Sequence, residues 1–125
     1  MHGPNYEISV RHDYVLVERP QNFSVVIDEQ PALLSELSAA CKRADTRNVL
    51  ILGPKTKVSL SVLDIFELGI EIADSRLRIA LVEEHDATSE DLEFLENVVW
   101  NRGGVIRFFD SKDEAEDWLG PLQPH

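Results

Sequence analysis

The stretch NVLILGPKTKVSLSVLDIFELGIEIADSRLRIALV, residues 48–82, decides the fold of this chain. It begins with an apolar run, Asn48–Leu52, which Gly53-Pro54 ends, and it closes with a second apolar run, Leu77–Val82. Between them, from about Ser61 to Asp74, apolar residues recur at the three- and four-residue spacing of a helix. Because continuous apolar strands are typical of helix-covered sheets, this stretch predicts two parallel strands joined by a helix.

A hairpin and a helix are predicted before this stretch. Residues 6–19 alternate between apolar and polar side chains, and a polar break at His12 and Asp13 is typical of a turn between two strands. Residues 28–44 place apolar side chains on one helical face, to which Cys41 belongs. We therefore expect an antiparallel hairpin, followed by a helix that buries Cys41 as a free thiol.

A helix, a strand and a short helix are predicted after it. The first helix starts at Thr88 and stops at Gly103-Gly104, and the strand covers Val105–Phe109. Ser111 and Glu114 have the spacing of a capping box, which predicts the start of the last helix. The predicted order is β-β-α-β-α-β-α-β-α, which indicates a single α/β domain over residues 1–125 with a mixed, mostly parallel sheet.

The composition fits one domain in a reducing compartment. With 125 residues, of which 43% are apolar, the chain can build one core without disulfides or a structural metal. Its single cysteine cannot form an internal bridge. Residues 1–6 lack the basic and apolar segments of a secretion signal, and no apolar run reaches the roughly 18 residues that span a bilayer. We expect a cytoplasmic protein without a membrane span.

The chain is strongly acidic. Twelve basic and 23 acidic residues give a formal net charge of −11, which repels phosphate backbones and anionic lipids. Nucleic acid is therefore not an expected partner. The acidic residues are mixed among apolar ones, so most of this charge indicates solvated helix faces.

The helix predicted between Ser61 and Asp74 is unusually apolar. Its polar positions fall on one line along the helix, which we call the acidic stripe: Asp64, Glu67, Glu71 and Asp74. Apolar residues occupy the side predicted to lie opposite: Leu63, Phe66, Ile70 and Ala73. This pattern predicts that most of the helix surface is buried and that only the acidic stripe contacts water. The acidic stripe itself suits either a solvated face or a basic partner.

The C-terminal segment resembles a known family. Phe108-Phe109-Asp110, Glu114-Ala115 and Trp118-Leu119 resemble the closing strand and helix of SpoIIAA-like proteins, which are related to the STAS domains of anti-sigma-factor antagonists. The similarity in element order covers nearly the whole chain. Independently of the resemblance, the helical spacing predicts a buried face for the last helix, formed by Ala115, Trp118 and Leu119.

The resemblance implies a STAS-like fold and a phosphorylation site. In STAS antagonists, a partner kinase phosphorylates a serine at the start of the helix after a central strand, and the unmodified form docks on that partner. The matching position here holds Ser59 and Ser61, which are the candidate phosphoacceptors. The family's Asp-Ser-Ser/Thr-Gly motif is replaced by Lys57-Val58-Ser59-Leu60-Ser61, so the match is one of position. Many SpoIIAA-like proteins lack that motif and have no settled role, and this sequence fits them better.

The loop before the second predicted helix is the best candidate for a binding site. In an open α/β sheet, ligands bind where a strand ends and a helix begins, and free N–H groups there attract anions. Residues 53–59 lack the second glycine of a P-loop, and Pro54 removes one backbone donor. The site would bind an anion, a phosphoserine or an acidic partner through Lys55, Lys57, Ser59 and Ser61. The alternative is an ordinary loop in which Ser59 or Ser61 caps the helix.

Catalytic and metal sites are not expected. Glu83-Glu84-His85-Asp86 offers ligands, but adjacent residues rarely converge on one metal ion. A hydrolase triad of Ser59 or Ser61 with His85 and Asp86 lacks the G-x-S-x-G elbow, and two neighbouring residues cannot easily orient each other. We therefore predict no catalytic residue, no cofactor and no metal.

Two functions remain open at this stage. The leading one is a non-enzymatic regulatory or interaction domain that binds a protein through the 55–61 loop and the second helix. The alternative is a small-molecule or lipid-binding domain, because related folds enclose apolar ligands in a pocket beneath their helices. A homodimer through an exposed helix or edge strand is allowed on general grounds, although no residue demands it.

Overall fold

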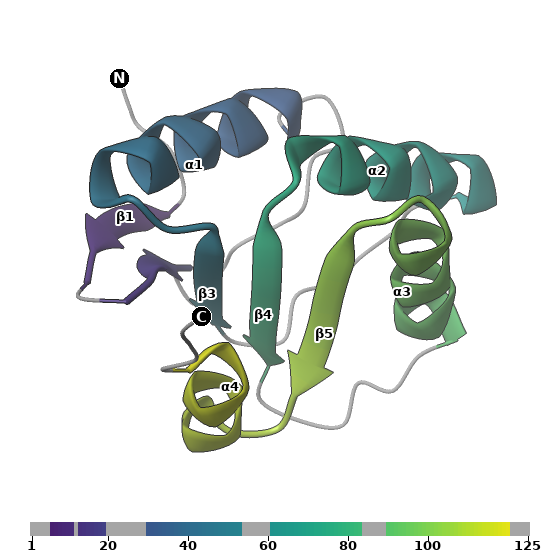
Figure 1. The fold of residues 1–125 in the computed structure, drawn as a ribbon. Helices are drawn as coiled ribbons and strands as arrows, with labels where there is room; N and C mark the ends of the chain where they lie inside the picture. Colours follow the sequence, from purple (N-terminus) through teal and green to yellow (C-terminus); the bar gives the residue numbers. More distant parts are fainter. Residues whose placement is uncertain (1–5, 12, 20–29, 54–60, 84–89, 121–125) are drawn as a thin grey trace.

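The computed structural model describes residues 6–11, 13–19, 30–53, 61–83 and 90–120. These residues form five strands and four helices in the predicted order (Figure 1). The strands are β1 (Glu7–Val10), β2 (Val15–Glu18), β3 (Asn48–Gly53), β4 (Arg78–Glu83) and β5 (Val105–Phe109). The helices are α1 (Gln30–Ala44), α2 (Val62–Ser75), α3 (Glu90–Asn101) and α4 (Lys112–Leu119). None of the helices in these described ranges is both long and apolar enough to cross a bilayer.

The strands form one mixed sheet in the order β1-β2-β3-β4-β5. The β1–β2 pair is antiparallel, and the three following pairs are parallel, which confirms the predicted hairpin and the mostly parallel sheet. The strand order, which the sequence pattern did not determine, follows the chain. Each parallel strand is therefore joined to its neighbour through a helix, as the length of a parallel crossover requires.

The larger part of the core lies between the sheet and helices α1, α2 and α3. Side chains alternate across a strand, so every second strand residue points toward these helices. On the strands, the fully buried members of this main core include Val15, Val17 and Val49, and Ile79 is 2% exposed. Leu37 and Cys41 of α1 pack against them, and Cys41 is a buried free thiol as predicted. Burial raises the pKa of this thiol to about 11.

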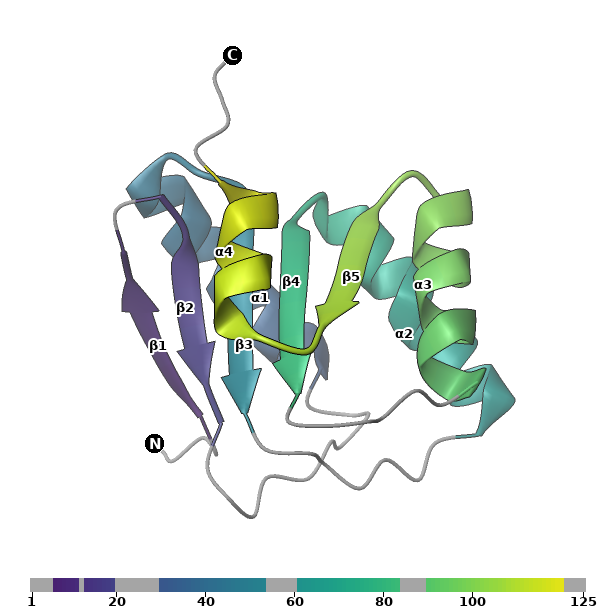
Figure 2. The ribbon, with the colours of Figure 1, turned by 90° about the horizontal axis from the view of Figure 1, so that it is seen from below.

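The opposite face of the sheet is covered by α4. Figure 2 shows α4 in front of the sheet, with α1 and α2 behind it. Leu16, Leu50 and Ala80 form the core on this side together with Ala115 and Leu119 of α4. The predicted buried face of the last helix is thus confirmed for its alanine and leucine, whereas Trp118 is only half-buried.

The expected burial of α2 is confirmed for Ala73 and wrong for Leu63 and Phe66. The face that packs on the sheet and neighbouring helices consists of Ile65, Leu68, Gly69, Ile72 and Ala73. Two residues predicted to be buried instead contact solvent, because the side chain of Leu63 is 62% exposed and that of Phe66 is 38% exposed. The physical reason is that apolar residues occupy more than one face of this helix. Hydrophobic spacing does not say which of those faces meets the core.

Close packing against α3 selects the buried face. A Cβ atom placed on Gly69 would lie 2.5 Å from Cγ1 of Val98, so only glycine allows α3 to approach this closely. Just after α3, a Cβ atom on Gly104 would lie 2.6 Å from the backbone Cα of Ala73. Contact with α3 therefore orients Gly69 and Ala73 inward, and the neighbouring apolar residues of α2 turn outward.

Candidate functional site

The predicted loop begins at a defined end of the sheet. Gly53, the last residue of β3, pairs with Glu83, the last residue of β4, so both strands end side by side. Lys55, Lys57 and Ser59 lie outside the described residues. The same holds for Glu84, His85 and Asp86, which were weighed as metal ligands or as part of a triad. Of the predicted site residues, the structure describes Ser61.

Ser61 is the N-cap of α2, which confirms one of the two predicted positions for the cap. Its Oγ atom accepts a hydrogen bond from the backbone N–H of Asp64 at 3.1 Å. In return, Oδ2 of Asp64 accepts a hydrogen bond from the backbone N–H of Ser61 at 3.2 Å. This reciprocal capping box satisfies two amides at the helix start and fixes where the loop enters α2. The side chain of Ser61 is exposed.

Two parallel lines of residues run along the solvent side of α2, and together we call them the α2 outer face. The first is the acidic stripe. The second, which we call the apolar stripe, consists of Leu63, Phe66 and Ile70 at steps of three and four residues. With 3.6 residues per turn, the two stripes lie next to each other, so the expectation that they lie on opposite sides of the helix is wrong. Leu63 and Phe66 are exposed, and Ile70 is half-buried.

The α2 outer face has a strongly negative edge. Neither α2 nor α3 contains a lysine or an arginine, whereas both contain several carboxylates. Within the described part of the chain, Glu67, Glu71 and Asp74 form no salt bridge. On the side of α3, the guanidinium of Arg102 lies 5.7 Å from the ring centroid of Phe66. The apolar stripe is therefore flanked by carboxylates on one side and by one cation on the other.

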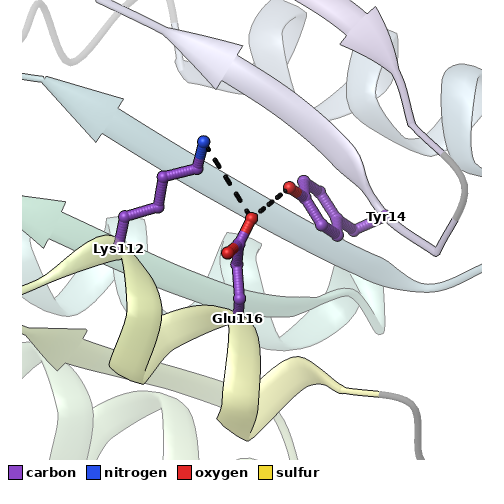
Figure 3. A network of polar contacts seen from close by, with 3 residues as sticks. All are labelled: Tyr14, Lys112 and Glu116. Atoms are coloured by element: carbon purple, nitrogen blue, oxygen red, sulfur yellow. Dashed lines mark hydrogen bonds and ion pairs between the residues drawn. The ribbon is translucent and has the colours of Figure 1, made fainter.

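A polar network joins the hairpin to α4 on the other face of the sheet (Figure 3). The hydroxyl of Tyr14 donates a hydrogen bond to Oε2 of Glu116 at 2.7 Å, and Nζ of Lys112 lies 4.0 Å from the same oxygen. Burial and this hydrogen bond raise the pKa of Tyr14 to about 12. The phenol is therefore protonated at neutral pH, and the network acts as a structural tie between the hairpin and α4.

Arg78 on β4 supports the end of α4. Its guanidinium donates hydrogen bonds to the backbone oxygens of Trp118 at 2.9 Å and Leu119 at 3.2 Å, and it lies 4.0 Å from the ring centroid of Trp118. Sequence reasoning missed both Arg78 and Tyr14. An arginine within an otherwise apolar strand was the available signal for Arg78, because an arginine in such a position usually has a buried partner.

The described residues contain no group of three or more His, Cys, Asp or Glu side chains that could hold a metal ion. The carboxylates of the α2 outer face are spread along one helix. They therefore do not converge on one point, as the ligands of a metal ion do. Chemically, this face offers apolar contact area beside a row of hydrogen-bond acceptors. Such an arrangement suits binding of another molecule.

Comparisons with known proteins identify the fold. No family model matches the sequence, and no curated protein matches it. Among solved structures, the chain is similar to a crystal structure from Shewanella loihica PV-4, described as an uncharacterised protein from the DUF3478 family with a SpoIIAA-like fold. The two chains share 20% sequence identity with a TM-score of 0.50, and the match covers 92% of each. The likeness first seen in the C-terminal residues thus extends to the whole architecture, and the chain has a SpoIIAA-like fold.

Proposed function

We propose that this chain is a non-enzymatic regulatory or protein-interaction domain whose partner contacts the α2 outer face. The main support for the proposal is that α2 exposes large apolar side chains to solvent although its inner face is well packed. On the α2 outer face, Leu63 is 62% exposed and Phe66 is 38% exposed, and next to them Val62, the first residue of α2, is 69% exposed. Neighbouring apolar side chains left in water are a common mark of a protein interaction site, because a partner removes them from solvent.

The position of this face supports the same proposal. It begins at Ser61, directly after the segment that holds Lys55, Lys57 and Ser59. A partner seated on the first turns of α2 would therefore also meet the loop that the sequence predicts as a binding site. Ser59 and Ser61 stay the proposed phosphoacceptors, and the exposed side chain of Ser61 is accessible to a kinase. The absence of any disulfide framework, with Cys41 as a buried free thiol, supports a cytoplasmic location.

The test is capture of partners from the source cells with four versions of the tagged domain. The wild type is compared with Leu63→Gln and with a loop variant in which Lys55, Lys57, Ser59 and Ser61 are all replaced by Ala. Trp100→Gln is the matched control, because it removes a 71% exposed apolar side chain from α3. Circular dichroism checks that every variant is folded.

We expect the α2 and loop variants to lose a partner that both the wild type and the Trp100→Gln control retain. Equal capture by all four versions would show that the partner uses another surface and would refute the proposal. Phosphopeptide mapping of the protein from the same cells tests Ser59 and Ser61. The apolar-ligand alternative makes a different prediction, namely a small mass retained by the purified domain in native mass spectrometry.

A further inference from the structure

We infer that the partner presents a basic amphipathic helix, which lies along α2 with its apolar side on the apolar stripe and its lysines or arginines on the acidic stripe. This inference rests on the proposed function and adds the chemical class of the partner segment. Three properties of the α2 outer face support it: the spacing of its apolar residues, the charge beside them and the cation on the opposite border.

The spacing of the apolar stripe suits a second helix. Leu63, Phe66 and Ile70 follow one another at three and four residues, so they form a ridge along about two turns, or roughly 10 Å of helix. An amphipathic helix carries its own apolar residues at the same spacing, and two such ridges interlock side by side. Because the inner face of α2 is packed in the core, the ridge is formed before any partner arrives.

The charge beside the ridge requires a basic partner. The acidic stripe runs parallel to the apolar stripe, and Glu67 and Asp74 are exposed. Within the described residues, no salt bridge neutralises Glu67, Glu71 or Asp74, so these carboxylates are available to cations from outside. Lysine or arginine on one flank of a docked helix would meet them, whereas glutamate there would be repelled.

Charge also argues against the other occupants of such a face. A second copy of this chain carries the same net charge of −11 and brings the same acidic helix, so long-range repulsion opposes pairing. An anionic bilayer is repelled for the same reason. The same negative charge that repels a second copy and an anionic bilayer attracts a basic protein segment.

Arg102 makes the two flanks of the apolar stripe different in charge. Its guanidinium lies 5.7 Å from the ring centroid of Phe66, and Arg102 directly follows α3, which packs against Gly69 on the side of α2 away from the acidic stripe. A docked helix therefore meets carboxylates along one flank and a cation near the other. Lysines confined to the flank above the acidic stripe fit this arrangement, and lysines placed on both flanks fit it less well.

The direct test uses a designed peptide as the probe. It is a helix of about 18 residues with leucines at positions i, i+3, i+7 and i+10 and lysines on one flank. The matched control peptide has glutamate in place of each lysine. Binding is followed by fluorescence anisotropy with labelled peptide, and the contact surface is mapped by backbone amide NMR shifts of the isotopically labelled domain. We expect the lysine peptide to bind at least about tenfold more tightly and to shift the amides of residues 62–74.

Paired variants separate local contact from overall charge. Glu67→Lys combined with Glu71→Lys reverses two charges on the acidic stripe, and Glu7→Lys combined with Asp117→Lys reverses two exposed charges on β1 and α4. Both doubles change the net charge equally. The first should weaken lysine-peptide binding about tenfold or more, and the second about twofold or less. Equal losses, or amide shifts confined to other elements, would overturn the inference.

The apolar contact has its own pair of variants. Leu63→Gln combined with Phe66→Gln should weaken binding about tenfold, whereas Trp100→Gln should leave it within about twofold. If the double variant is unfolded, Leu63→Gln is used by itself, since its side chain is mostly exposed. Analytical ultracentrifugation of the wild type checks for a second copy as the occupant, and dimerisation lost in the Leu63→Gln variant would refute the inference.

The outcomes also separate this inference from the proposed function. A cellular partner that is lost on Leu63→Gln, but that the lysine peptide does not displace, would support the interaction domain and reject the basic helix. A cellular partner retained by all α2 variants would reject the proposed surface itself.

Discussion

At the scale of single residues, Tyr14 is the group with the clearest consequence for pH. Its folded pKa of about 12 lies above the value of about 10 of an unfolded tyrosine. Its contribution to stability is therefore fully present below pH 10 and is lost as the pH rises toward 12 and beyond. We expect the wild type to be about 1 kcal/mol more stable than Tyr14→Phe at pH 8, and this difference to shrink between pH 10 and 12. Urea unfolding of both proteins at each pH measures it.

The control for this prediction is Tyr6→Phe. The hydroxyl of Tyr6 also donates to a carboxylate, Oε1 of Glu36 at 2.6 Å, but this bond is exposed. Removing it should change the free energy of unfolding less than Tyr14→Phe does. Absorbance at 295 nm gives a second readout, because the titration lost in Tyr14→Phe should have its midpoint near 12. A midpoint near 10 would contradict the assignment.

Arg78 is expected to stabilise the C-terminal end of α4. The last turn of this helix contains no basic residue, and the guanidinium of Arg78 donates to its terminal carbonyls from outside. Arg78→Lys keeps the positive charge but loses the planar fork and much of the stacking on Trp118. We expect it to lower the free energy of unfolding by about 1–2 kcal/mol and to speed hydrogen exchange in α4 first.

Arg107→Lys is the matched control. The guanidinium of Arg107 lies 5.9 Å from the ring centroid of Trp118, compared with 4.0 Å for Arg78, and the residue is exposed. Its replacement should change stability by less than about 0.5 kcal/mol. If both variants were equally stable, the hydrogen bonds of Arg78 to α4 would contribute nothing beyond its charge.

The structural role of a residue could be predicted from the sequence where it depends only on residues nearby in the chain. Ser61 was a candidate cap because capping depends on residues within one turn, and the structure confirms it. The partners of Tyr14 and Arg78 lie 102 and about 40 positions away in the chain. No local pattern encodes such pairs, because they exist only once β2, β4 and α4 have packed together.

At the scale of secondary-structure elements, the contact between α2 and α3 depends on Gly69. Alanine normally stabilises a helix interior by about 1 kcal/mol relative to glycine. Here the added Cβ atom would lie 2.5 Å from Cγ1 of Val98 and 2.9 Å from its Cβ atom. Because real contacts of this kind are much longer, we expect Gly69→Ala to destabilise the domain by about 2 kcal/mol despite its better helix propensity. Thermal and urea unfolding measure the change.

A double-mutant cycle identifies the cause. Val98→Ala removes Cγ1, the nearest atom that the new Cβ would meet, but keeps the Cβ atom at 2.9 Å, and it loses some buried area. In the Val98→Ala background, Gly69→Ala should therefore destabilise the domain clearly less than it does in the wild type. If Gly69→Ala destabilised both backgrounds equally, the clash with Val98 would not be the reason.

The same contact explains why the environment of α2 was predicted incorrectly although its position was predicted well. Its start, its end and its acidic stripe follow from local spacing. Its buried face depends on where α3 approaches, and that is a property of two elements together. Leu63 and Phe66 are as apolar as the residues that were buried in their place, so no hydrophobic pattern separates the two groups.

At the scale of the whole molecule, the sequence predicts the elements and the mostly parallel sheet, but not the strand order. The apolar strands β3 and β4 are similar enough that their positions could be exchanged on pattern alone. The free edge of the sheet is also a global feature. At β5, the backbone N–H of Phe108 donates to Oε2 of Glu96 on α3 at 3.3 Å, so a helix side chain occupies part of this edge. This hydrogen bond could not be predicted from the sequence, because it depends on where α3 lies relative to β5.

Net charge is the whole-molecule property that connects stability with binding. The formal charge of −11 opposes the compact state through self-repulsion. The ion pair Lys112–Glu116 is a partly exposed i,i+4 pair at 4.0 Å, so little attraction is lost when it is screened. Raising NaCl from about 0.01 to 0.1 M shortens the screening length from about 30 to about 10 Å. We therefore expect salt to raise the melting temperature by about 4 °C, which corresponds to about 1 kcal/mol.

The same increase in salt concentration should lower the affinity for the lysine peptide, although it raises the stability of the domain. Attraction between the lysine peptide and the acidic stripe is screened along with the self-repulsion, so peptide binding should weaken while the domain becomes more stable. Measuring the melting temperature and the peptide affinity on one set of samples tests both directions at once. Glu67→Lys combined with Glu71→Lys should gain stability less steeply with salt and lose most of the salt dependence of peptide binding. Stability and affinity that both rose with salt would show that apolar contact, and not the acidic stripe, selects the partner.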